Sequence, residues 1–564
     1  MENKKIIIAA KIVIALLCAM AFFPSLKGDF VMWDDPSYVT ENDVIKTMSF
    51  KNLSSIFSSG FVGQYCPATM LVYMLVYKFF GLNPFYFHLV SYLLNILVSL
   101  AVFGLIMSIS ENIVISFLTA ALFAVHPLHV ESVAWVSELK DVLCALFYIL
   151  SLIRYVVYVK NGKTRDYVLS AVFCMLALAS KAMAVSLPFA LLLIDLFYKR
   201  KIGSRVILEK IPFFAMAAVI SALTIYLHTQ TEAFNVAFPA SVGFYYLIKS
   251  LVFYFAKTVW PIDLSAVYSM ATTLSPAVLA QTKFRLIGLA VLFAMLVLFA
   301  IRDRRVFLGV SLFFVTIFPV LKIKAVSTAW AADRYMYLPS IGLLLAFVSI
   351  IGSVSNLKIL KRFIRPDLIL IAVISFFIAA FSYMTWNRCP VWQNTRTLFM
   401  DILLRDPGIG VFYSTIAEYY EKKGDLPRAG KFYERAFIVS QIEKFKDFAK
   451  RIEEEIAMLP AGEAEKGNSG QTQEERSQEA KLVNMIGRMR GSRGDIDTAI
   501  SLFQEGLELD PKNPDIYNNL GFALCMKKDY ERARACFEKA LELDPKHWKA
   551  AHNLKMISGP APSS

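Results

Sequence analysis

Two adjacent carboxylates, Asp34 and Asp35, stand in a short polar segment directly after the first apolar stretch of the chain. They belong to the run Trp33-Asp34-Asp35-Pro36. Adjacent carboxylates can act as a general base and its helper, or they can hold a divalent cation. An exposed acidic turn is the alternative, because Asp-Pro commonly begins a turn. The residues alone leave both interpretations open.

A second polar cluster separates two long apolar stretches. It begins with His126 and His129 in the run His-Pro-Leu-His-Val-Glu, and it continues to Glu138, Lys140 and Asp141. Histidines and carboxylates at a helix break can bind a metal ion or a phosphate group. The alternative for each histidine is a buried structural role. So polar a cluster between apolar stretches favours a binding or catalytic site, because ionisable groups at such positions are costly.

Two further cations are candidate phosphate ligands. Lys181 lies between two apolar stretches, where its ammonium is costly unless an anion meets it or its stem reaches the membrane interface. Arg334 stands between Asp333 and Tyr335 at the start of another apolar stretch. A guanidinium fork pairs well with phosphate oxygens, and a structural Asp–Arg pair beside interfacial aromatic residues is the alternative.

The seven cysteines are scattered, without a CxxC pair and without the spacing of zinc ligands. They predict neither a disulfide framework nor a zinc site. We therefore assign no metal-binding residues. A divalent cation at the carboxylate pair stays open, and the cofactor is unknown.

The helices that carry these residues are expected to lie in a membrane, because the composition of the chain is strongly apolar. Of the 564 residues, 57% are apolar and 18% are charged. Soluble domains are roughly 45–50% apolar and about 25% charged. A soluble chain of this composition could not cover its apolar surface, which excludes an ordinary soluble enzyme and a disordered protein. The net charge of +14 lies entirely in residues 1–386, and residues 387–564 hold equal numbers of basic and acidic residues.

Apolar stretches of about 20 residues predict helices that cross a membrane. The first is expected to be an uncleaved anchor, because no small-residue cleavage site follows it. Ser241–Trp260 is expected to lie at the interface, since Lys249 and Lys257 interrupt one side of it, and Met70–Phe80 is treated in the same way. About 11 spans are predicted, at residues 6–23, 84–109, 112–126, 130–153, 167–180, 182–198, 210–228, 284–301, 306–321, 338–355 and 367–386.

The distribution of basic residues predicts the orientation. Basic residues gather in cytoplasmic loops of membrane proteins. With a cytoplasmic N-terminus, five segments that together hold 19 basic and 4 acidic residues fall inside: 1–11, 154–166, 199–210, 302–305 and 358–365. The candidate site residues and residues 387–564 then lie on the non-cytoplasmic side. The charge is therefore an orientation signal, and we expect no nucleic-acid partner.

The polar tail contains a repeat of 34 residues. Gly487, Ala499, Phe503 and Leu507 recur 34 positions later, and Asp510-Pro511 recurs as Asp544-Pro545. This period, with small residues where two helices cross, is typical of tetratricopeptide (TPR) repeats. TPR units stack into a solenoid that binds polypeptides. The expected domains are a first TPR and a helix (387–458), a polar linker (459–480), two TPRs with a capping helix (481–557) and a disordered end (558–564).

The motifs occur in an order that resembles a known family. They are Trp33-Asp34-Asp35, His126-Pro127-Leu128-His129-Val130-Glu131, Lys140-Asp141, Ser180-Lys181 and Ala332-Asp333-Arg334-Tyr335-Met336-Tyr337, with TPRs behind them. This order resembles the transmembrane-and-TPR O-mannosyltransferase group of the GT-C superfamily, in a bacterial-type form. The expected fold is therefore all-α: a GT-C-like membrane helix bundle followed by a TPR α-solenoid.

The resemblance implies a glycosyltransferase. The donor would be a polyprenyl-phosphate sugar, mannose-like, and the acceptor a hydroxyl group, on a protein in the characterised members, with inversion at the sugar. Asp34 or Asp35 would be the catalytic carboxylate. The residues expected to bind the substrate or its phosphate are His126, His129, Lys140, Lys181, Asp333, Arg334 and Tyr335. The TPRs would hold the acceptor or a partner protein.

Two readings from other classes remain. A membrane-anchored TPR scaffold for envelope assembly, with an inactive core, would tolerate neutralisation of the outer charges. A transporter should contain repeated sets of spans, and the sequence has no such symmetry. We interpret the chain as a protein of the bacterial inner membrane with periplasmic TPRs, or of the endoplasmic reticulum with lumenal TPRs in a eukaryote. The sugar and the acceptor are not encoded in any recognisable pattern.

Overall fold

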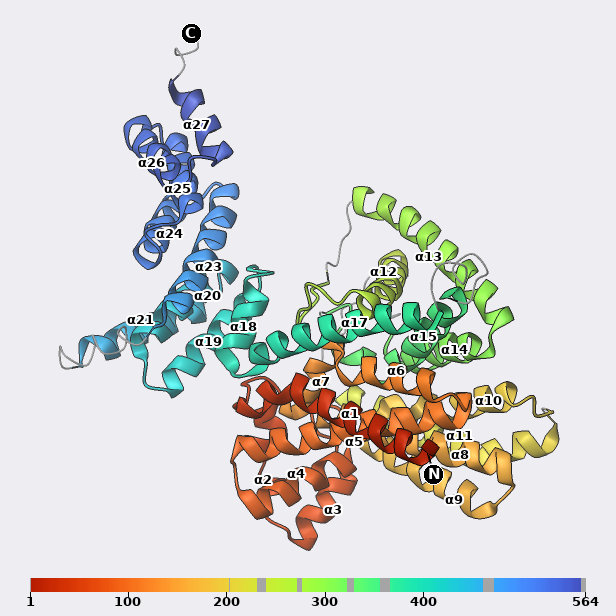
Figure 1. Cartoon of the computed structure of the whole chain (residues 1–564). Coiled ribbons are helices and arrows are strands. Elements are labelled where there is room, and N and C mark those ends of the chain that lie inside the picture. The colour runs from red at the N-terminus through yellow and green to blue at the C-terminus, as the bar shows by residue number, and fades with distance from the viewer. Residues whose placement is uncertain are drawn as a thin grey trace. The chain divides into compact units, whose positions relative to one another are not determined.

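The computed structural model describes residues 2–201, 203–230, 240–270, 276–321, 329–355, 366–459 and 471–558. The chain divides into two compact units, Met1–Asn394 and Thr395–Ser564. Both are built from helices, and the described residues form no strand beyond two isolated bridges (Figure 1). The all-α class is confirmed, and the units divide eight residues beyond the boundary expected at residue 386.

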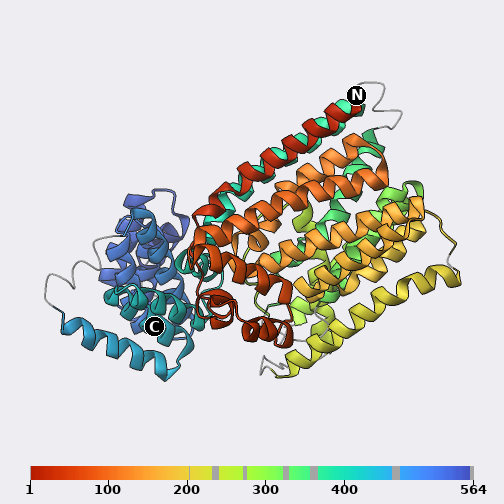
Figure 2. The same ribbon diagram turned by 90° about the horizontal axis from the view of Figure 1, so that it is seen from below.

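Long apolar helices make up the first unit. Its main helices are α1 (Glu2–Phe22), α4 (Pro67–Phe80), α5 (Pro84–Ser110), α6 (Ile113–Ala124), α8 (Leu139–Asn161), α9 (Thr164–Ser180), α10 (Leu187–Phe197), α11 (Ser204–Gln230), α12 (Ala240–Val259), α13 (Pro276–Arg302), α14 (Arg304–Ile317), α15 (Ser340–Ser355) and α17 (Pro366–Arg388). Helix α1 packs against α5, α6 and α17, and it runs beside α17 in Figure 2. The short helices α2 (Asp43–Lys46) and α3 (Phe50–Ser58) pack beside α4.

Helix length and hydropathy indicate a multi-pass membrane protein. Six described helices are long and apolar enough to cross a bilayer, or seven if the bent pair Ile113–Ala124 and Pro127–Ala134 counts as one span. Shorter apolar helices lie at Pro67–Phe80, Ala182–Phe197 and Ser340–Val354. Helix α12, which was expected to lie at the interface, is not among these candidates. The count of about 11 crossings stays a prediction.

The predicted span at 130–153 is not one continuous helix. After α6 the chain bends by 52°, and it then forms a 3₁₀ turn (Pro127–His129), the short helix α7 (Val130–Ala134) and a second 3₁₀ turn (Val136–Glu138) before α8 begins. The His126 ring caps the first turn by accepting the Leu128 amide hydrogen at 3.2 Å. The polar run is therefore an irregular segment. Irregular backbone at membrane depth is tolerated where it is buried in protein or lines a cavity, and this segment can present polar side chains to the interior of the unit.

Small residues allow two of these helices to touch closely. A Cβ built on Gly342 of α15 would come within 2.3 Å of the Gly309 carbonyl oxygen on α14, and a Cβ on Gly309 would come within 2.5 Å of the Gly342 carbonyl oxygen. Only glycine fits at this crossing, as is common where membrane helices pack. The contact helps to place α15, which follows the segment that carries Arg334.

The second unit consists of paired antiparallel helices. They are α18 (Thr395–Leu403), α19 (Gly410–Lys422), α20 (Leu426–Ser440), α21 (Glu443–Ala457), α23 (Gln473–Ser492), α24 (Ile496–Leu509), α25 (Pro514–Met526), α26 (Tyr530–Leu543) and α27 (Trp548–Ser558). The repeated glycines explain the period, because a Cβ on Gly487 would meet the Phe503 ring at 2.7 Å and one on Gly521 would meet the Phe537 ring at 2.7 Å.

The polar linker predicted at residues 459–480 ends before residue 473. Helix α23 begins at Gln473, and Thr472 and Glu475 form a reciprocal cap at its start. Residues 473–480 are therefore helical, because this cap satisfies the free amide groups of a new helix. Residues 460–470 of the expected linker, and 559–564 of the expected disordered end, lie outside the described residues, as do residues 358–365 of the expected cytoplasmic segments.

Candidate active site

Asp35 is an internal anchor of the segment that follows α1. Its side chain is fully buried. One carboxylate oxygen accepts the Val31 amide hydrogen at 2.8 Å, and the other accepts the Ser137 amide hydrogen at 3.0 Å and the Ser137 hydroxyl hydrogen. These bonds fasten the first loop to the turn before α8. Asp35 therefore has no free carboxylate oxygen to offer a substrate.

Asp34 differs from its neighbour. Its side chain is partly exposed, and no hydrogen bond among the described residues reaches its carboxylate. The charges that act on it belong to Lys140, Glu138, Arg334 and Lys181, which come from three distant parts of the chain. Of the two predicted carboxylates, that of Asp34 is thus the one that lies within electrostatic range of the other candidate residues and forms no hydrogen bond among the described residues.

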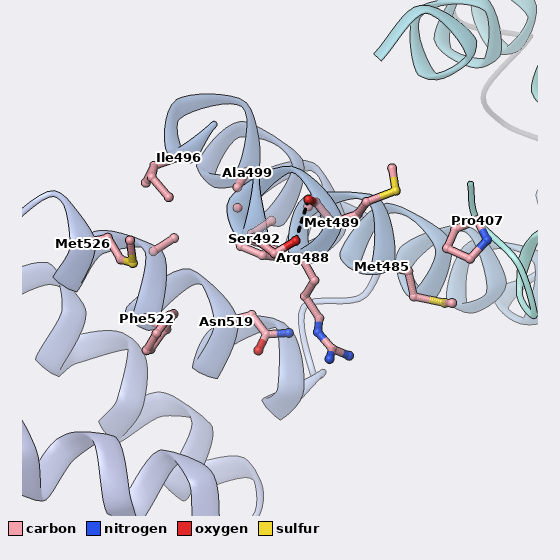
Figure 3. A pocket seen from close by; sticks show the side chains of 14 residues that line it. Pro407, Met485, Arg488, Met489, Ser492, Ile496, Ala499, Asn519, Phe522 and Met526 are labelled. Carbon is pink, nitrogen blue, oxygen red and sulfur yellow. Dashed lines mark hydrogen bonds between the residues drawn. The ribbon is translucent and has the colours of Figure 1, made fainter. Parts of the chain in front are cut away.

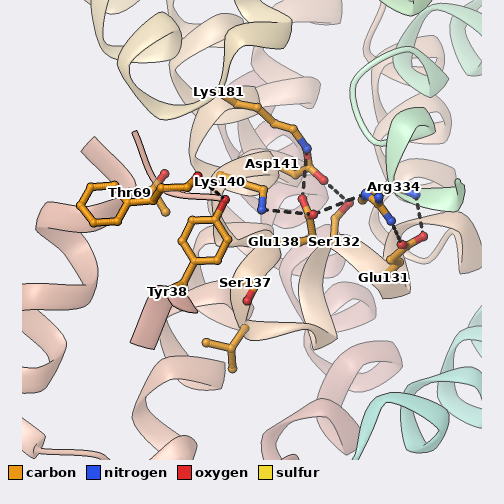
Figure 4. A network of polar contacts seen from close by, with 12 residues as sticks. Tyr38, Thr69, Glu131, Ser132, Ser137, Glu138, Lys140, Asp141, Lys181 and Arg334 are labelled. Atoms are coloured by element: carbon orange, nitrogen blue, oxygen red, sulfur yellow. Dashed lines mark hydrogen bonds and ion pairs between the residues drawn. The ribbon is translucent and has the colours of Figure 1, made fainter. Parts of the chain in front are cut away.

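A network of ion pairs joins the irregular segment 127–141 to Lys181 and Arg334 (Figure 4). The Lys181 ammonium nitrogen lies 2.5 Å from an Asp141 oxygen and 3.0 Å from a Glu138 oxygen. The Arg334 side chain forms an ion pair with Glu131 and stands 3.4 Å from Glu138, while its backbone amide donates to Glu131 at 3.0 Å. The structure therefore brings together residues that are up to about 200 positions apart.

Lys140 enters the same network from the first turn of α8. Its nitrogen lies 3.3 Å from a Glu138 oxygen and 4.4 Å from the centre of the Tyr38 ring. The side chain is only 1% exposed, yet the ammonium group donates no hydrogen bond within the described protein. Its charge is met by the Glu138 carboxylate and the Tyr38 ring, so Lys140 adds positive charge to the site from a buried position.

Helix termini and loops position these groups. Helix α9 ends at Ser180 and leaves Lys181 in extended backbone, while Asp141 lies in the first turn of α8, where a carboxylate is favoured by the helix dipole. Arg334 belongs to the 3₁₀ turn Asp333–Met336. With 21% of its side chain exposed, Arg334 is the most accessible cation of the network, compared with 10% for Lys181.

Aromatic rings form a wall beside the network. The rings of Trp33 and Trp135 lie 5.1 Å apart, and Trp135 stacks on Trp392 at 5.1 Å. The Arg334 guanidinium lies 5.7 Å from the Trp135 ring centre and 5.2 Å from that of Tyr335. Such contacts hold the guanidinium plane while its nitrogens pair with carboxylate oxygens.

Both predicted histidines are committed to the protein interior. The His126 ring contacts the Thr258 carbonyl at 3.0 Å through one nitrogen and the Leu128 amide through the other. The His129 ring contacts the Phe123 carbonyl at 3.0 Å and the Ser340 hydroxyl at 2.9 Å. Both side chains are fully buried. With all four ring nitrogens engaged, they bind the surrounding helices together and leave none for a phosphate.

Asp333 lies next to the network without entering its ion pairs. It accepts the Tyr268 hydroxyl hydrogen at 2.8 Å, and it is buried. Burial and then the nearby Glu131 carboxylate raise the pKa of Asp333 to about 7. Tyr335 is half-buried and contacts the Arg334 guanidinium. These two residues support Arg334.

The electrostatics favour a proton acceptor at Asp34. Burial raises the pKa of the Asp34 carboxyl above its usual range, against the opposing effect of the Lys140 ammonium. Burial also raises the pKa of Asp35 to about 6. Burial disfavours the charge on Lys181, but the Asp141 and Glu138 carboxylates outweigh that effect and raise its pKa, so the ammonium stays charged. A carboxylate with a raised pKa beside fixed cations suits general-base chemistry.

The residues present do not fit a metal centre. Among the residues that the structure describes, no three His, Cys, Asp or Glu side chains are grouped to hold an ion. The acidic residues of the network are each paired with a lysine or an arginine. A divalent cation would have to displace these cations, and we assign it no role.

The predicted set of site residues omits the acidic half of the network and Ser137. Glu131, Glu138 and Asp141 lie in the same polar run as the predicted residues, so their position beside Lys140 was a usable signal. Ser137 gives no signal in the sequence, because its contact with Asp35 joins segments 102 residues apart.

A second site lies in the TPR unit. A groove of about 680 Å³ is lined by apolar side chains of α23, α24 and α25, and a polar groove of about 620 Å³ shares Arg488, Asn519 and Phe522 with it (Figure 3). The polar groove carries a row of amides, in which Asn519 donates to Asn484 at 2.9 Å and Asn553 donates to Asn518 at 3.0 Å. Such a row suits an extended ligand with repeated hydrogen-bonding groups.

Comparisons with known proteins agree with both units. Residues 492–555 match the tetratricopeptide repeat family. Over 142 residues the chain is 34% identical to Protein O-mannosyl-transferase TMTC1 of Homo sapiens, covering 23% of this chain and 16% of that protein. It is 32% identical over 167 residues to TMTC4 of Homo sapiens, covering 26% and 22%. The resemblance stated from the motifs is confirmed, although the chain spans only 16% to 22% of the length of these relatives.

Solved structures give weaker likenesses. The ArnT structure from Cupriavidus metallidurans bound to undecaprenyl phosphate is 14% identical, with a TM-score of 0.37, over 73% of this chain and 80% of that one. The structure of YrrB, a TPR protein with an unusual peptide-binding site, is 19% identical with a TM-score of 0.14, over 37% of this chain and 98% of that one. At these TM-scores neither superposition adds to the assignment of the fold.

Proposed function

We propose that this chain is a membrane glycosyltransferase of the GT-C type that moves a mannose-like sugar from a polyprenyl-phosphate donor to a hydroxyl group, on a protein acceptor. One observation carries the proposal. A partly exposed carboxylate, Asp34, lies within electrostatic range of Lys140, Lys181 and Arg334, three cations held in place by buried acids. The similarity to protein O-mannosyl-transferases supports the same activity.

The reaction needs a base on one side of the sugar and positive charge on the other. The acceptor oxygen attacks the anomeric carbon and loses its proton to the Asp34 carboxylate. The bond between the anomeric carbon and the phosphate oxygen breaks, and its electron pair leaves with the polyprenyl phosphate. Attack opposite the leaving group inverts the configuration at the anomeric carbon. A positioned base contributes about 10²–10⁴-fold to such a step.

The three cations stabilise the leaving phosphate. Arg334 is the most accessible of them, and its Nη2 nitrogen, which forms no ion pair among the described residues, can donate to a phosphate oxygen. Lys140 adds positive charge from a buried position, and Lys181 fixes the acids that would otherwise repel the phosphate. Fixed donors aimed at developing charge typically contribute about 10²–10³-fold each. Asp35 is a positioning residue in this scheme, since its oxygens are bound to Val31 and Ser137.

The site would lie on the non-cytoplasmic side of the membrane. With a cytoplasmic N-terminus, the strongly basic segments fall inside, and Asp34, Lys181 and Arg334 fall outside. The TPR unit follows on the same side, in the bacterial periplasm or the lumen of the endoplasmic reticulum. Its amide row and apolar groove would hold the acceptor polypeptide.

Sugar transfer by the purified protein tests the proposal. The full chain in detergent is incubated with labelled polyprenyl-phosphate mannose and related donors, together with an unfolded protein acceptor. We expect label to appear on protein and free polyprenyl phosphate to appear in equal amount. A membrane-anchored TPR scaffold would transfer no label from any donor, while changes on its TPR groove would still disturb its cellular role. That result would refute the glycosyltransferase proposal and favour the scaffold.

A further inference from the structure

Two cations on neighbouring helices of the membrane unit form no ion pair with an acidic residue that the structure describes. The Lys249 nitrogen on α12 lies 4.0 Å above the Trp330 ring and 5.8 Å from the Tyr245 ring centre. The Arg285 guanidinium on α13 lies 5.4 Å from the same tyrosine ring and donates to its hydroxyl at 2.9 Å. Among the described parts of the chain, no carboxylate forms an ion pair with either.

This arrangement leaves positive charge unbalanced. Other buried or half-buried cations of the unit, among them Lys181, Lys210 and Arg334, meet a carboxylate. Burial and the nearby Arg285 charge lower the pKa of Lys249 to about 8. A charged side chain inside a membrane protein is stable when an opposite charge meets it. An anion from outside the protein would supply that charge for both residues.

An apolar groove of about 350 Å³ is lined in part by Arg285. Its remaining lining is apolar or glycine: Val252, Phe255, Ala256, Val259, Gly288, Leu289 and Leu292. None of the apolar window within Phe284–Arg302 of α13 is buried by the protein, so this face of α13 meets the bilayer. A groove of this kind, with Arg285 in its wall and Lys249 on the same Tyr245 ring as Arg285, combines features that bind a lipid tail and an anionic headgroup.

We propose that Lys249 and Arg285 bind the phosphate of an anionic bilayer phospholipid whose acyl chain lies in the groove between α12 and α13. Charge complementarity selects an anionic headgroup. The groove opens to the bilayer, where phospholipids far outnumber carrier lipids, so mass action favors a phospholipid. The site is separate from the ion-pair network and goes beyond the proposed sugar transfer.

The lipid would also steady the segment that leads to the network. Lys249 covers Trp330, and the Ser250 hydroxyl donates to the Trp330 carbonyl at 3.1 Å. Trp330 precedes Arg334 by four residues. A phosphate that holds Lys249 in place therefore fixes one end of the turn that carries Arg334.

Lipid retention by the full-length protein tests this site. The purified chain is titrated with phosphatidylglycerol or phosphatidylcholine in detergent, and bound lipid is counted by native mass spectrometry. We expect tight binding of phosphatidylglycerol alone, and binding about 30-fold weaker when Lys249→Gln and Arg285→Gln are combined. The matched control combines Arg532→Gln and Lys539→Gln in the TPR unit, which remove the same charges from exposed positions and should leave binding unchanged.

Two further variants keep the test informative if the neutralised protein folds poorly. Lys249→Arg with Arg285→Lys keeps both charges and should retain the lipid. Gly288→Trp fills the groove, because a Cβ there meets nothing within 4 Å, and it should weaken lipid binding while leaving both cations in place. Equal binding of both phospholipids, or no effect of the Gln and Trp variants, would overturn the site. Tight binding of farnesyl phosphate in place of phosphatidylglycerol would overturn the choice of lipid.

Discussion

Substitution of Asp34 and Asp35 one at a time should separate a base from an anchor. Asp35→Ala removes the acceptor of two buried amide hydrogens, those of Val31 and Ser137. Each buried donor left unpaired costs about 1–3 kcal/mol, so we expect a loss of about 2–6 kcal/mol in stability. Asp34→Asn keeps the side-chain shape and breaks no hydrogen bond, so its stability should stay within about 0.5 kcal/mol of the wild type.

Asp34→Asn should therefore lose mainly activity, whereas Asp35→Ala should lose mainly stability. Sugar transfer should fall about 10²–10⁴-fold in Asp34→Asn, because the base is gone while the fold persists. Asp35→Ala should lower the midpoint of thermal unfolding in mild detergent, followed as loss of monodisperse protein. Activity of its surviving fraction should decline less than that of Asp34→Asn. A fully stable Asp35→Ala protein, or a destabilised Asp34→Asn protein, would refute the division of roles.

Three other outcomes follow from the same contacts. Lys181→Met leaves the buried Asp141 carboxylate without its cation, while Glu138 keeps Lys140 and Arg334, and it should cost about 3–5 kcal/mol, measured by denaturant unfolding; an unchanged midpoint would contradict the buried network. Gly342→Ala places a methyl group against a backbone carbonyl and should cost about 1–3 kcal/mol, whereas Gly288→Ala points into open space and should be neutral in the same assay. Burial raises the pKa of Asp34, and the base must be deprotonated to act. As the pH is lowered, kcat/KM should therefore begin to fall at a higher pH than it would for an ordinary aspartate. A flat profile down to pH 4 would argue against this base.

Long-period patterns predicted the architecture well. The 34-residue repeat fixed the helices of the TPR unit, because Gly487 and Gly521 are the positions where the Phe503 and Phe537 rings press on the facing helix. Most apolar stretches became helices at the predicted places, since hydropathy measures the need for burial directly. The start of α23 at Gln473 was missed because a polar composition obscured a strong helix cap.

The site was predicted less completely. The sequence treats Asp34 and Asp35 as equivalent, and the structure distinguishes them by the burial of Asp35 and by its contacts with Val31 and with Ser137, 102 residues away. The histidines were prominent as residue types, but their partners, such as Thr258 for His126, come from distant helices. Local patterns identify which residues are costly to bury, whereas tertiary contacts decide which of them remain free.

The most direct measurement of the central claim is the rate of sugar transfer from labelled polyprenyl-phosphate mannose by three purified proteins: wild type, Asp34→Asn and Asp43→Asn. Asp43 lies in the same polar segment with 91% of its side chain exposed, so it controls for loss of a charge. The account predicts transfer by the wild type and by Asp43→Asn, and a loss of about 10²–10⁴-fold in Asp34→Asn. Equal transfer by all three proteins would contradict the role of Asp34, and no transfer by any of them from any polyprenyl-phosphate sugar would contradict the enzyme.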